Sequence, residues 1–489
     1  MRIVGTNGGP FILAAILVPI LGSLICAALD SRRSSAALVL LAALQFGATL
    51  VAGAAVMSSG EVTLEWPWMQ SLGAYLSFRA DYLSVAFAVL VSGLSLAVAV
   101  YARSYMDGPD GKASFFAWQS LFSGSMMGVL FAGDMILFYL FWELMLIPST
   151  ALIVYWGQGK HPVRVGVKYY MVTHIGALLM LSGILWTIVL TGTSHMGVSA
   201  RLLAEANPVA VGRIAVLLAA GFMVKMAVVP GHIWLPDAHS EAQLPTSIML
   251  SAVMMNMGIY GALRFLGGMM PASTLAAMSV PLMVMGIINQ WYGGFQALRQ
   301  QELKRMAAYS TVSQMGYVLF GIGAAGVLGL KGAVMQALAH GVGKALLFMT
   351  IGVIIHNTGA HKMEEVGGLG RRMPLAMLCA VAAALTLAGA PPLAAYQSEW
   401  QIFAAGISRV GLPLTMLSIG SSILTALYCL GFVMRVFYGE EKTPSGLIAD
   451  ARGGMLSPML VLALASLALG VFPAISSGWA EVAVSRLLH

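Results

Sequence analysis

The sequence has 489 residues, of which 59% are hydrophobic and only 9% are charged. A soluble domain carries roughly a quarter charged residues, so lipid rather than water is the expected solvent for most of this chain. The formal net charge of +7 comes from basic residues scattered in short loops, a pattern that argues against nucleic acid as a partner.

Apolar segments recur from one end of the chain to the other and predict an all-α integral membrane protein of about fourteen transmembrane helices, because each segment is near the ~20 residues that a bilayer core requires. The expected spans are Phe11–Leu29, Ala36–Met57, Tyr82–Tyr101, Ser114–Phe131, Met135–Trp156, Val165–Leu190, Ile214–Pro236, Pro245–Phe265, Leu275–Leu298, Met306–Ile322, Ala333–Ile355, Pro374–Ala405, Leu412–Phe437 and Ser457–Phe472. The loops are short, which predicts a single polytopic membrane domain over residues 1–489.

Lysine and arginine are more frequent in the loops that follow odd-numbered spans, for example Arg32, Arg33 and Lys160. The positive-inside rule places these loops in the cytoplasm. With an even number of spans, both termini are then expected outside, on the periplasmic or extracellular face of the cytoplasmic membrane.

Four charged residues that fall inside predicted spans are the main functional candidates: Glu143, Lys225, Lys344 and Glu399. A charge at the bilayer centre is costly, so it usually faces the interior of a bundle and usually has a function. Two acidic and two basic groups that change protonation state in turn suit a path for protons. The alternative is a set of static ion pairs between helices, but buried pairs contribute little stability compared with apolar packing.

Two of these spans also contain helix-breaking residues. Lys225 is followed by Pro230, and Glu399 is preceded by Pro391 and Pro392. Proline removes a backbone donor and frees a carbonyl, which a membrane tolerates only where the freed group lines a cavity or finds another partner. Simple proline kinks are the alternative, but a buried charge beside both breaks favours a functional interpretation.

Interrupted helices at corresponding positions of two halves are typical of transporters built from inverted repeats. The breaks lie five spans apart, so two related five-helix halves are predicted. Spans 4–8 form the first, at about residues 114–265, and spans 9–13 form the second, at about residues 275–437.

Histidine titrates closest to neutral pH and can extend a proton path. His340 and Lys344 are four residues apart and therefore share a helix face, which makes His340 the strongest candidate of its type. A lone histidine is as often a hydrogen-bonded core residue. Further candidate relay residues lie in the sixth span and around the end of the seventh: His174, His232, Asp237 and His239.

Several motifs resemble those of the antiporter-like subunits of respiratory complex I. They are Phe141-Trp-Glu-Leu-Met145 with Pro148, the stretch Lys225–Ser240 (KMAVVPGHIWLPDAHS), Leu303–Ser310 and Gly389–Trp400. The family also includes subunits of cation/proton antiporters and the membrane arms of energy-converting hydrogenases. The resemblance is greatest to subunit M, because Glu399 stands where that subunit has glutamate and the L-type has lysine.

The resemblance implies a central hydrophilic axis along which protons move from the pair Glu143 and Lys225 to Glu399. It implies other antiporter-like membrane subunits and a peripheral redox arm as partners. Iron–sulfur, flavin or nickel–iron centres belong to that arm, and no cofactor is expected in this chain. The three cysteines form no CxxC pair, which argues independently against an iron–sulfur or metal site here.

Two positions depart from the family pattern. Asn256 stands where many subunit M sequences have a lysine in the eighth span, and Gln314 stands where a histidine in the tenth span is common. Asparagine can hydrogen-bond water but cannot carry a proton at neutral pH. The middle of the path would therefore depend on water and on His340 with Lys344.

Three functions account for some or all of these features. The first is a non-catalytic, proton-translocating subunit of a complex I-like NADH or ferredoxin:quinone oxidoreductase, coupled to redox reactions in partner subunits. The alternative is a subunit of a membrane-bound energy-converting hydrogenase or of a stand-alone multi-subunit Na+/H+ antiporter. The third is a structural scaffold, which titratable residues beside helix breaks argue against because a scaffold does not need them.

Overall fold

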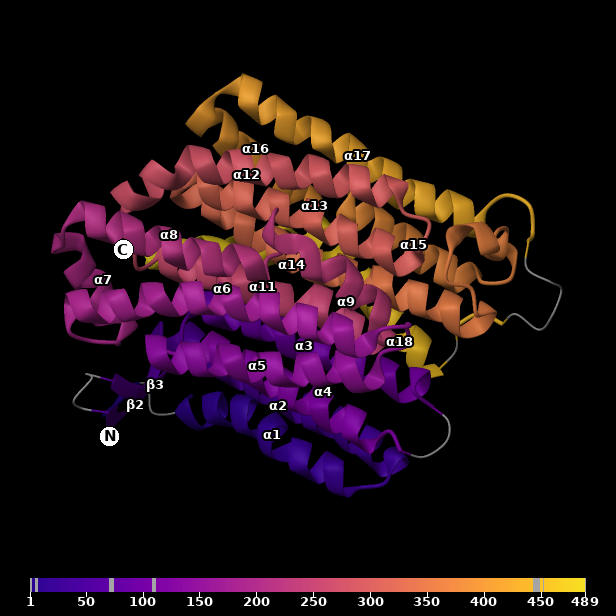
Figure 1. Ribbon diagram of the computed structural model, residues 1–489, viewed down its shortest axis with the longest axis horizontal. Coiled ribbons are helices and arrows are strands. Elements are labelled where there is room, and N and C mark those ends of the chain that lie inside the picture. Colours follow the sequence, from indigo (N-terminus) through magenta and orange to yellow (C-terminus); the bar gives the residue numbers. More distant parts are fainter. Residues whose placement is uncertain are drawn as a thin grey trace.

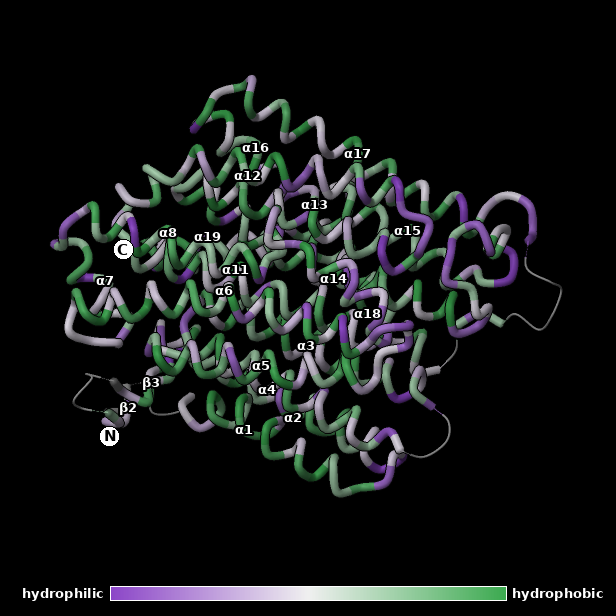
Figure 2. Tube along the Cα trace, in the orientation of Figure 1, coloured by the Kyte–Doolittle hydropathy of each residue, from purple (hydrophilic) through white to green (hydrophobic). Residues whose placement is uncertain are grey.

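The computed structural model describes residues 2–4, 8–69, 74–107, 111–442, 449–451 and 453–488. Long helices lie side by side and run along the same direction of the molecule (Figure 1). Within the described residues, 11 helices are long and apolar enough to cross a membrane. Figure 2 shows hydrophobic residues along most of these helices and hydrophilic residues gathered in the loops at the right-hand end of the bundle. The predicted class, a nearly all-helical integral membrane protein, is confirmed.

The N-terminal part of the bundle contains α1 (Gly9–Ala28), α2 (Ser31–Ser59), α3 (Tyr82–Tyr105), α4 (Ala113–Phe131), α5 (Met135–Trp156), α6 (Pro162–Thr191), α7 (Met196–Glu205), α8 (Pro208–Lys225), the 3₁₀ turn η2 (Gly231–Trp234) and α9 (Leu235–Glu241). One continuous, fully buried span follows at Leu244–Gly267. It consists of α10 (Leu244–Ile248), the π-helical segment η3 (Met249–Met254), α11 (Met255–Ala262) and the π-helical segment η4 (Leu263–Gly267).

The C-terminal part contains α12 (Ala272–Arg299), α13 (Leu303–Ala324), α14 (Gly326–Thr358), the 3₁₀ turns η5 (Met363–Glu365) and η6 (Leu369–Arg371), α15 (Pro374–Leu387), α16 (Ala395–Val410), α17 (Leu412–Phe437), α18 (Gly453–Val471) and α19 (Ala474–Leu488). α14 is almost wholly buried along its apolar window and packs against α13, α15, α16 and α18. The centre of the molecule is therefore built around α14 and the buried span Leu244–Gly267.

Each of the fourteen predicted spans falls on helical structure. Eleven correspond to the apolar spans above, and two more correspond to α4 and α13, which are long enough but less apolar. The predicted span Pro374–Ala405 is interrupted, as its prolines predicted, and is divided into α15 and α16. The predicted span Ile214–Pro236 is wrong at both ends, because α8 begins at Pro208 and ends at Lys225.

Several elements lie outside every predicted span, among them a small antiparallel sheet, α7, α19 and the 3₁₀ turns η5 and η6. The sheet has the order β1 (Arg2–Val4), β2 (Val62–Met69) and β3 (Ala74–Ala80). Figure 1 shows the sheet, α7 and both ends of the chain at the same end of the bundle. Both chain ends on one side agree with an even number of spans.

Candidate functional site

The first helix break follows Lys225, where α8 ends before Pro230. Ala227 there adopts a φ of 51°, in the left-handed region that side chains rarely occupy. The carbonyl of Val224 accepts two hydrogen bonds at the break, one of 3.1 Å from the N–H of Ala227 and one of 3.1 Å from Nε1 of Trp234. Backbone and side-chain donors together satisfy this carbonyl, as a membrane interior requires.

The second break separates α15, which ends at Leu387, from α16, which begins at Ala395. Gly389 lies between them with a φ of 64°. Nε2 of Gln314 donates a hydrogen bond of 3.1 Å to the carbonyl of Leu387. Gln314 therefore contacts the break directly, and its amide satisfies a group that the break frees.

The two breaks share one hydrogen-bonding pattern. In each, one N–H donates to the carbonyl three residues earlier, and the next N–H donates to the carbonyl five residues earlier. The donor and acceptor pairs are Ala227 with Val224 and Val228 with Met223 in the first break, and Gly389 with Thr386 and Ala390 with Leu385 in the second. The same backbone hydrogen-bonding pattern in both halves agrees with the predicted inverted repeats. The repeats remain a prediction.

Lys225 lies at the last position of α8 and its residue is only 2% exposed. Its Nζ is 5.8 Å from the ring centroids of both Trp142 and Tyr169, a cation–π arrangement. Within the described part of the chain, no carboxylate lies within 4.0 Å of this ammonium. Lys225 and Glu143, which the family resemblance pairs, therefore make no direct ion pair in this structure.

Glu143 is the exception among the four charges expected to be buried. Its side chain is 23% exposed in the single chain, so the expectation of full burial is wrong for this residue. One oxygen, Oε2, lies 3.1 Å from Nδ1 of His174, whose ring stacks on Tyr170. The other oxygen, Oε1, has no hydrogen-bond partner in the described structure. The Glu143 side chain is therefore partly exposed at the surface and also contacts the ring of His174.

α14 brings His340 and Lys344 to the buried centre of the bundle. The ammonium of Lys344 donates a hydrogen bond of 2.9 Å to the carbonyl of Ala307 and a second one to the hydroxyl of Ser310. Both ring nitrogens of His340 lack a partner among the described residues. His340 and Lys344 thus lie together in the buried centre of the bundle.

A second buried histidine lies at the same centre. His239 stacks on Phe348 at 4.9 Å, and both of its ring nitrogens also lack a partner in the described structure. Phe348 follows Lys344 by four residues on α14, just as Lys344 follows His340. His340 and His239 therefore flank Lys344 along one face of α14. The sequence suggested His239 only as a lone candidate, because its neighbours lie over a hundred residues later.

Glu399 lies on α16 and is buried. Its Oε2 accepts a hydrogen bond of 3.4 Å from the hydroxyl of Ser422, and its Oε1 has no partner in the described structure. Hydrogen-bonded side chains connect the second break to α16, the helix that carries Glu399. Gln336 donates to Gln314 at 2.9 Å, and Ser398, the neighbour of Glu399, donates to Gln336 at 2.5 Å.

The remaining relay candidates have local contacts. Asp237 makes ion pairs with Lys168 at 2.7 Å and Arg305 at 2.9 Å, which join α9 to α6 and α13. Nε2 of His232 lies 3.2 Å from the hydroxyl of Tyr292. Asn256 is fully buried and donates to the carbonyl of Ala252 in η3 at 2.7 Å, while its side-chain oxygen has no described partner.

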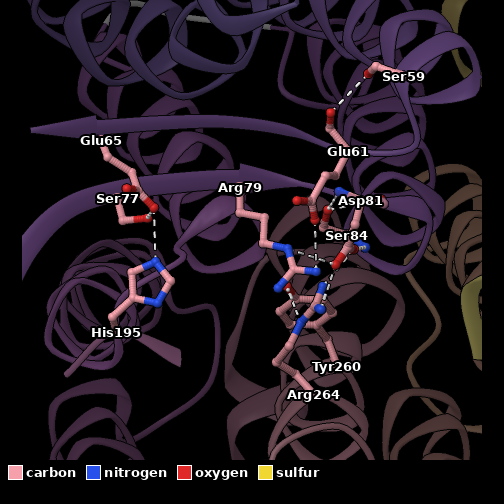
Figure 3. Close-up of polar contacts among 10 residues, drawn as sticks. All are labelled: Ser59, Glu61, Glu65, Ser77, Arg79, Asp81, Ser84, His195, Tyr260 and Arg264. Atoms are coloured by element: carbon pink, nitrogen blue, oxygen red, sulfur yellow. Dashed lines mark hydrogen bonds and ion pairs between the residues drawn. The ribbon is translucent and has the colours of Figure 1, made fainter. Parts of the chain in front are cut away.

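Two buried basic residues near span ends were not among the residues that the sequence singled out. Lys304 lies in the first turn of α13 and donates hydrogen bonds of 2.9 Å to the carbonyls of Ser240 and Ala242, at the end of α9. Arg264 lies in η4 and forms a bidentate ion pair with Asp81, with distances of 2.6 and 2.7 Å between the guanidinium nitrogens and the carboxylate oxygens (Figure 3). Lys304 and Arg264 lie at the ends of spans, where the sequence does not show whether a basic residue is buried or what it pairs with.

Replacing Gly389 with alanine is expected to destabilise the second break and displace Glu399. A Cβ added at Gly389 would lie 2.5 Å from Oε2 of Glu399, at a φ of 64°. Gly326 offers a matched control, because its φ is 63° and nothing lies within 4 Å of an added Cβ. The backbone strain alone costs about 1–2 kcal/mol in both variants. Thermal unfolding in detergent should show a clearly larger loss for Gly389→Ala, and equal losses would contradict the contact with Glu399.

These features together define a multi-span membrane protein with two interrupted helices beside buried titratable residues. Residues 132–425 match the family described as NADH:quinone oxidoreductase/Mrp antiporter, transmembrane. Residues 66–116 match the family described as NADH-ubiquinone oxidoreductase (complex I), chain 5 N-terminus. Because the first match covers more than half of the chain, the protein belongs to this family of antiporter-like membrane subunits, as the motifs predicted.

Individual relatives include both redox and antiporter proteins. The chain is 33% identical over 424 residues to NAD(P)H-quinone oxidoreductase chain 4 1 of Synechococcus sp. (strain JA-2-3B'a(2-13)), covering 84% of this chain and 79% of that protein. It is 30% identical over 415 residues to the putative antiporter subunit mnhA2 of Staphylococcus saprophyticus, covering 79% of this chain and 51% of that longer protein.

The fold is also that of a chain in a solved complex. The match is to a chain of respiratory complex I from Thermus thermophilus with bound NADH, with a TM-score of 0.87 and 25% sequence identity. It covers 98% of this chain and 100% of that chain. The whole architecture is therefore shared, including the parts that lie outside the predicted spans.

Proposed function

We propose that this chain is a proton-translocating, antiporter-like subunit of a complex I-like NADH or ferredoxin:quinone oxidoreductase. The main observation behind the proposal is a set of buried titratable side chains beside two helix breaks that have the same backbone hydrogen-bonding pattern. The likeness to a quinone oxidoreductase chain over most of both lengths supports it. Burying these groups is costly, and a scaffold has no use for groups that change protonation state.

The proposed path enters at Glu143, whose side chain reaches the surface and contacts His174. It continues to Lys225 and then to the centre, where His239 and His340 flank Lys344. The amide and hydroxyl groups of the second break lead on to Glu399 as the terminal site. Water fills the intervals between these groups, because unpartnered polar atoms occur at several of them.

The partners and location follow from this proposal. Other antiporter-like membrane subunits would pack beside the chain in the bilayer, and a peripheral redox arm would hold the iron–sulfur, flavin or nickel–iron centres. The excess of basic residues in odd-numbered loops supports a cytoplasmic membrane location with both termini outside. A subunit of a stand-alone cation/proton antiporter is the second candidate, supported by the likeness to the staphylococcal protein.

Affinity purification of the tagged chain in mild detergent, with mass spectrometry of the co-purified proteins, tests the proposal. Subunits with iron–sulfur, flavin or nickel–iron motifs are expected in the eluate. They would identify a redox-driven pump and name its electron donor. An eluate that contains only other membrane subunits, from cells in which the complex is intact, would contradict the redox proposal and favour the stand-alone antiporter.

A further inference from the structure

A cavity of about 280 Å³ lies at the end of the bundle that carries the sheet, α7 and α19. It lies where α2 ends, next to Gly60, and where α3 begins, at Tyr82. The cavity is therefore at the depth where several spans leave the membrane. Its charged wall residues are Glu61, Arg79, Asp81, Arg201, Arg264 and Arg486.

The wall of the cavity carries more positive than negative charge. Arg264 pairs with Asp81, and Arg79 lies 3.1 Å from Glu61 and 3.5 Å from Asp81, so these four residues form a neutral group (Figure 3). Two exposed arginines of the wall have no carboxylate within 4.0 Å in the described structure: Arg201 and Arg486. The cavity thus keeps an excess of positive charge at its open side.

An apolar groove of about 390 Å³ is lined by the same three helices, α2, α3 and α19, together with α14 and α18. On α19, Trp479 lines the groove, whereas Ala483 and Arg486 line the cavity. These residues follow one another at helical spacing and share one face of α19. The groove therefore leads along α19 into the basic cavity.

An aromatic pair marks the junction between groove and cavity. Nε1 of Trp479 donates a hydrogen bond of 2.7 Å to the carbonyl of Tyr82, and the two rings lie 5.0 Å apart. The guanidinium of Arg486 lies 4.8 Å above the ring of Tyr82. Tryptophan and tyrosine at the ends of spans are typical of the level of lipid headgroups.

We propose that the groove and the cavity together bind one anionic phospholipid. Its acyl chains would lie in the groove between α2, α3 and α19, and its phosphate would contact Arg201 and Arg486. Arginine suits this role because its planar guanidinium binds phosphate in a bidentate manner. The site is separate from the proposed ion path and does not depend on it.

Thermal unfolding of the purified full-length chain in mild detergent tests this site with three probes. Dihexanoyl phosphatidylglycerol is expected to raise the unfolding temperature in a concentration-dependent manner. Dihexanoyl phosphatidylcholine and inorganic phosphate are expected to have little effect. The double variant R201Q/R486Q should weaken the binding of phosphatidylglycerol by at least about tenfold, because the phosphate loses two partners for charge-assisted hydrogen bonds.

Two further variants separate the parts of the site. Ala54→Trp fills the groove from an exposed position of α2 and should also reduce binding, although it leaves both arginines in place. Arg213→Gln removes an exposed arginine of α8 outside the cavity and should bind the lipid like the unmodified protein. Equal stabilisation by phosphatidylcholine, equal stabilisation by phosphate alone, or unchanged binding in R201Q/R486Q would each overturn the proposal.

Discussion

Replacing Lys225 with methionine is expected to abolish coupled ion transport and to leave the protein folded. The ammonium of Lys225 has no carboxylate within 4.0 Å in the described structure and contacts the rings of Trp142 and Tyr169. The substitution therefore leaves no buried carboxylate without its partner. An unpaired buried charge is the usual cause of a large loss of stability. Methionine also keeps the length of the side chain. The variant loses only the group that can take up and release a proton beside the first break.

Inverted membrane vesicles that contain the assembled complex provide the measurement. Ion flux, followed as the quenching of a pH-sensitive dye, should fall by at least about tenfold, since one missing proton-transfer group typically costs two orders of magnitude or more. Lys331→Met is the matched control, because Lys331 pairs with Glu481 near the start of α14 and lies outside the proposed path. Normal flux in Lys225→Met, with normal amounts of assembled complex, would remove Lys225 from the mechanism.

The positions of the helices could be predicted from the sequence because lipid imposes a simple length and polarity rule on each span. The rule fails where the chain is broken inside the membrane. Pro391 and Pro392 indicated a break, but the division of the predicted twelfth span into α15 and α16 depends on Gly389 and on the amide of Gln314. That amide comes from another helix, so its contact is a property of the tertiary fold.

The candidate site was predictable in part for the same reason. Hydropathy identified Lys225, Lys344 and Glu399 as charges within apolar segments, and the structure buries all three. Hydropathy could not show that Glu143 reaches the surface, because a single sequence does not reveal which face of a membrane helix is buried in the bundle. Burial of Lys304 was also hidden, because a residue at a span end is buried or exposed according to what packs against it.

Replacing Asp81 with asparagine is expected to lower the free energy of unfolding by about 3–5 kcal/mol, because it leaves the guanidinium of Arg264 buried without its counter-charge. Asp81 also begins α3, where its carboxylate accepts a hydrogen bond of 3.0 Å from the N–H of Ser84. Asparagine caps a helix about as well as aspartate. The substitution therefore removes the charge and keeps the cap, and the loss reports on the ion pairs of Asp81 with Arg264 and, at 3.5 Å, with Arg79.

The pH dependence of this loss follows from the pKa of Asp81. Burial alone would raise that pKa, but the guanidinium of Arg264 holds it well below its usual range. The pair thus stabilises the folded protein fully above the unfolded pKa of about 3.9, and its contribution is lost as the pH falls toward the lower folded pKa. Thermal unfolding of both proteins in detergent should show a constant difference from pH 7 to about pH 5 and a shrinking difference below about pH 4.

A double variant separates the ion pair from other effects of Asp81. In D81N/R264M no buried charge is left unpaired, so most of the lost stability should return. The hydroxyl of Tyr260, which accepts a hydrogen bond from Arg264, still donates at 2.7 Å to the carbonyl of Leu130. If the double variant were as unstable as Asp81→Asn, the loss would arise from the cap or the cavity wall. The membrane boundary of α3 would then be fixed by packing and not by charge.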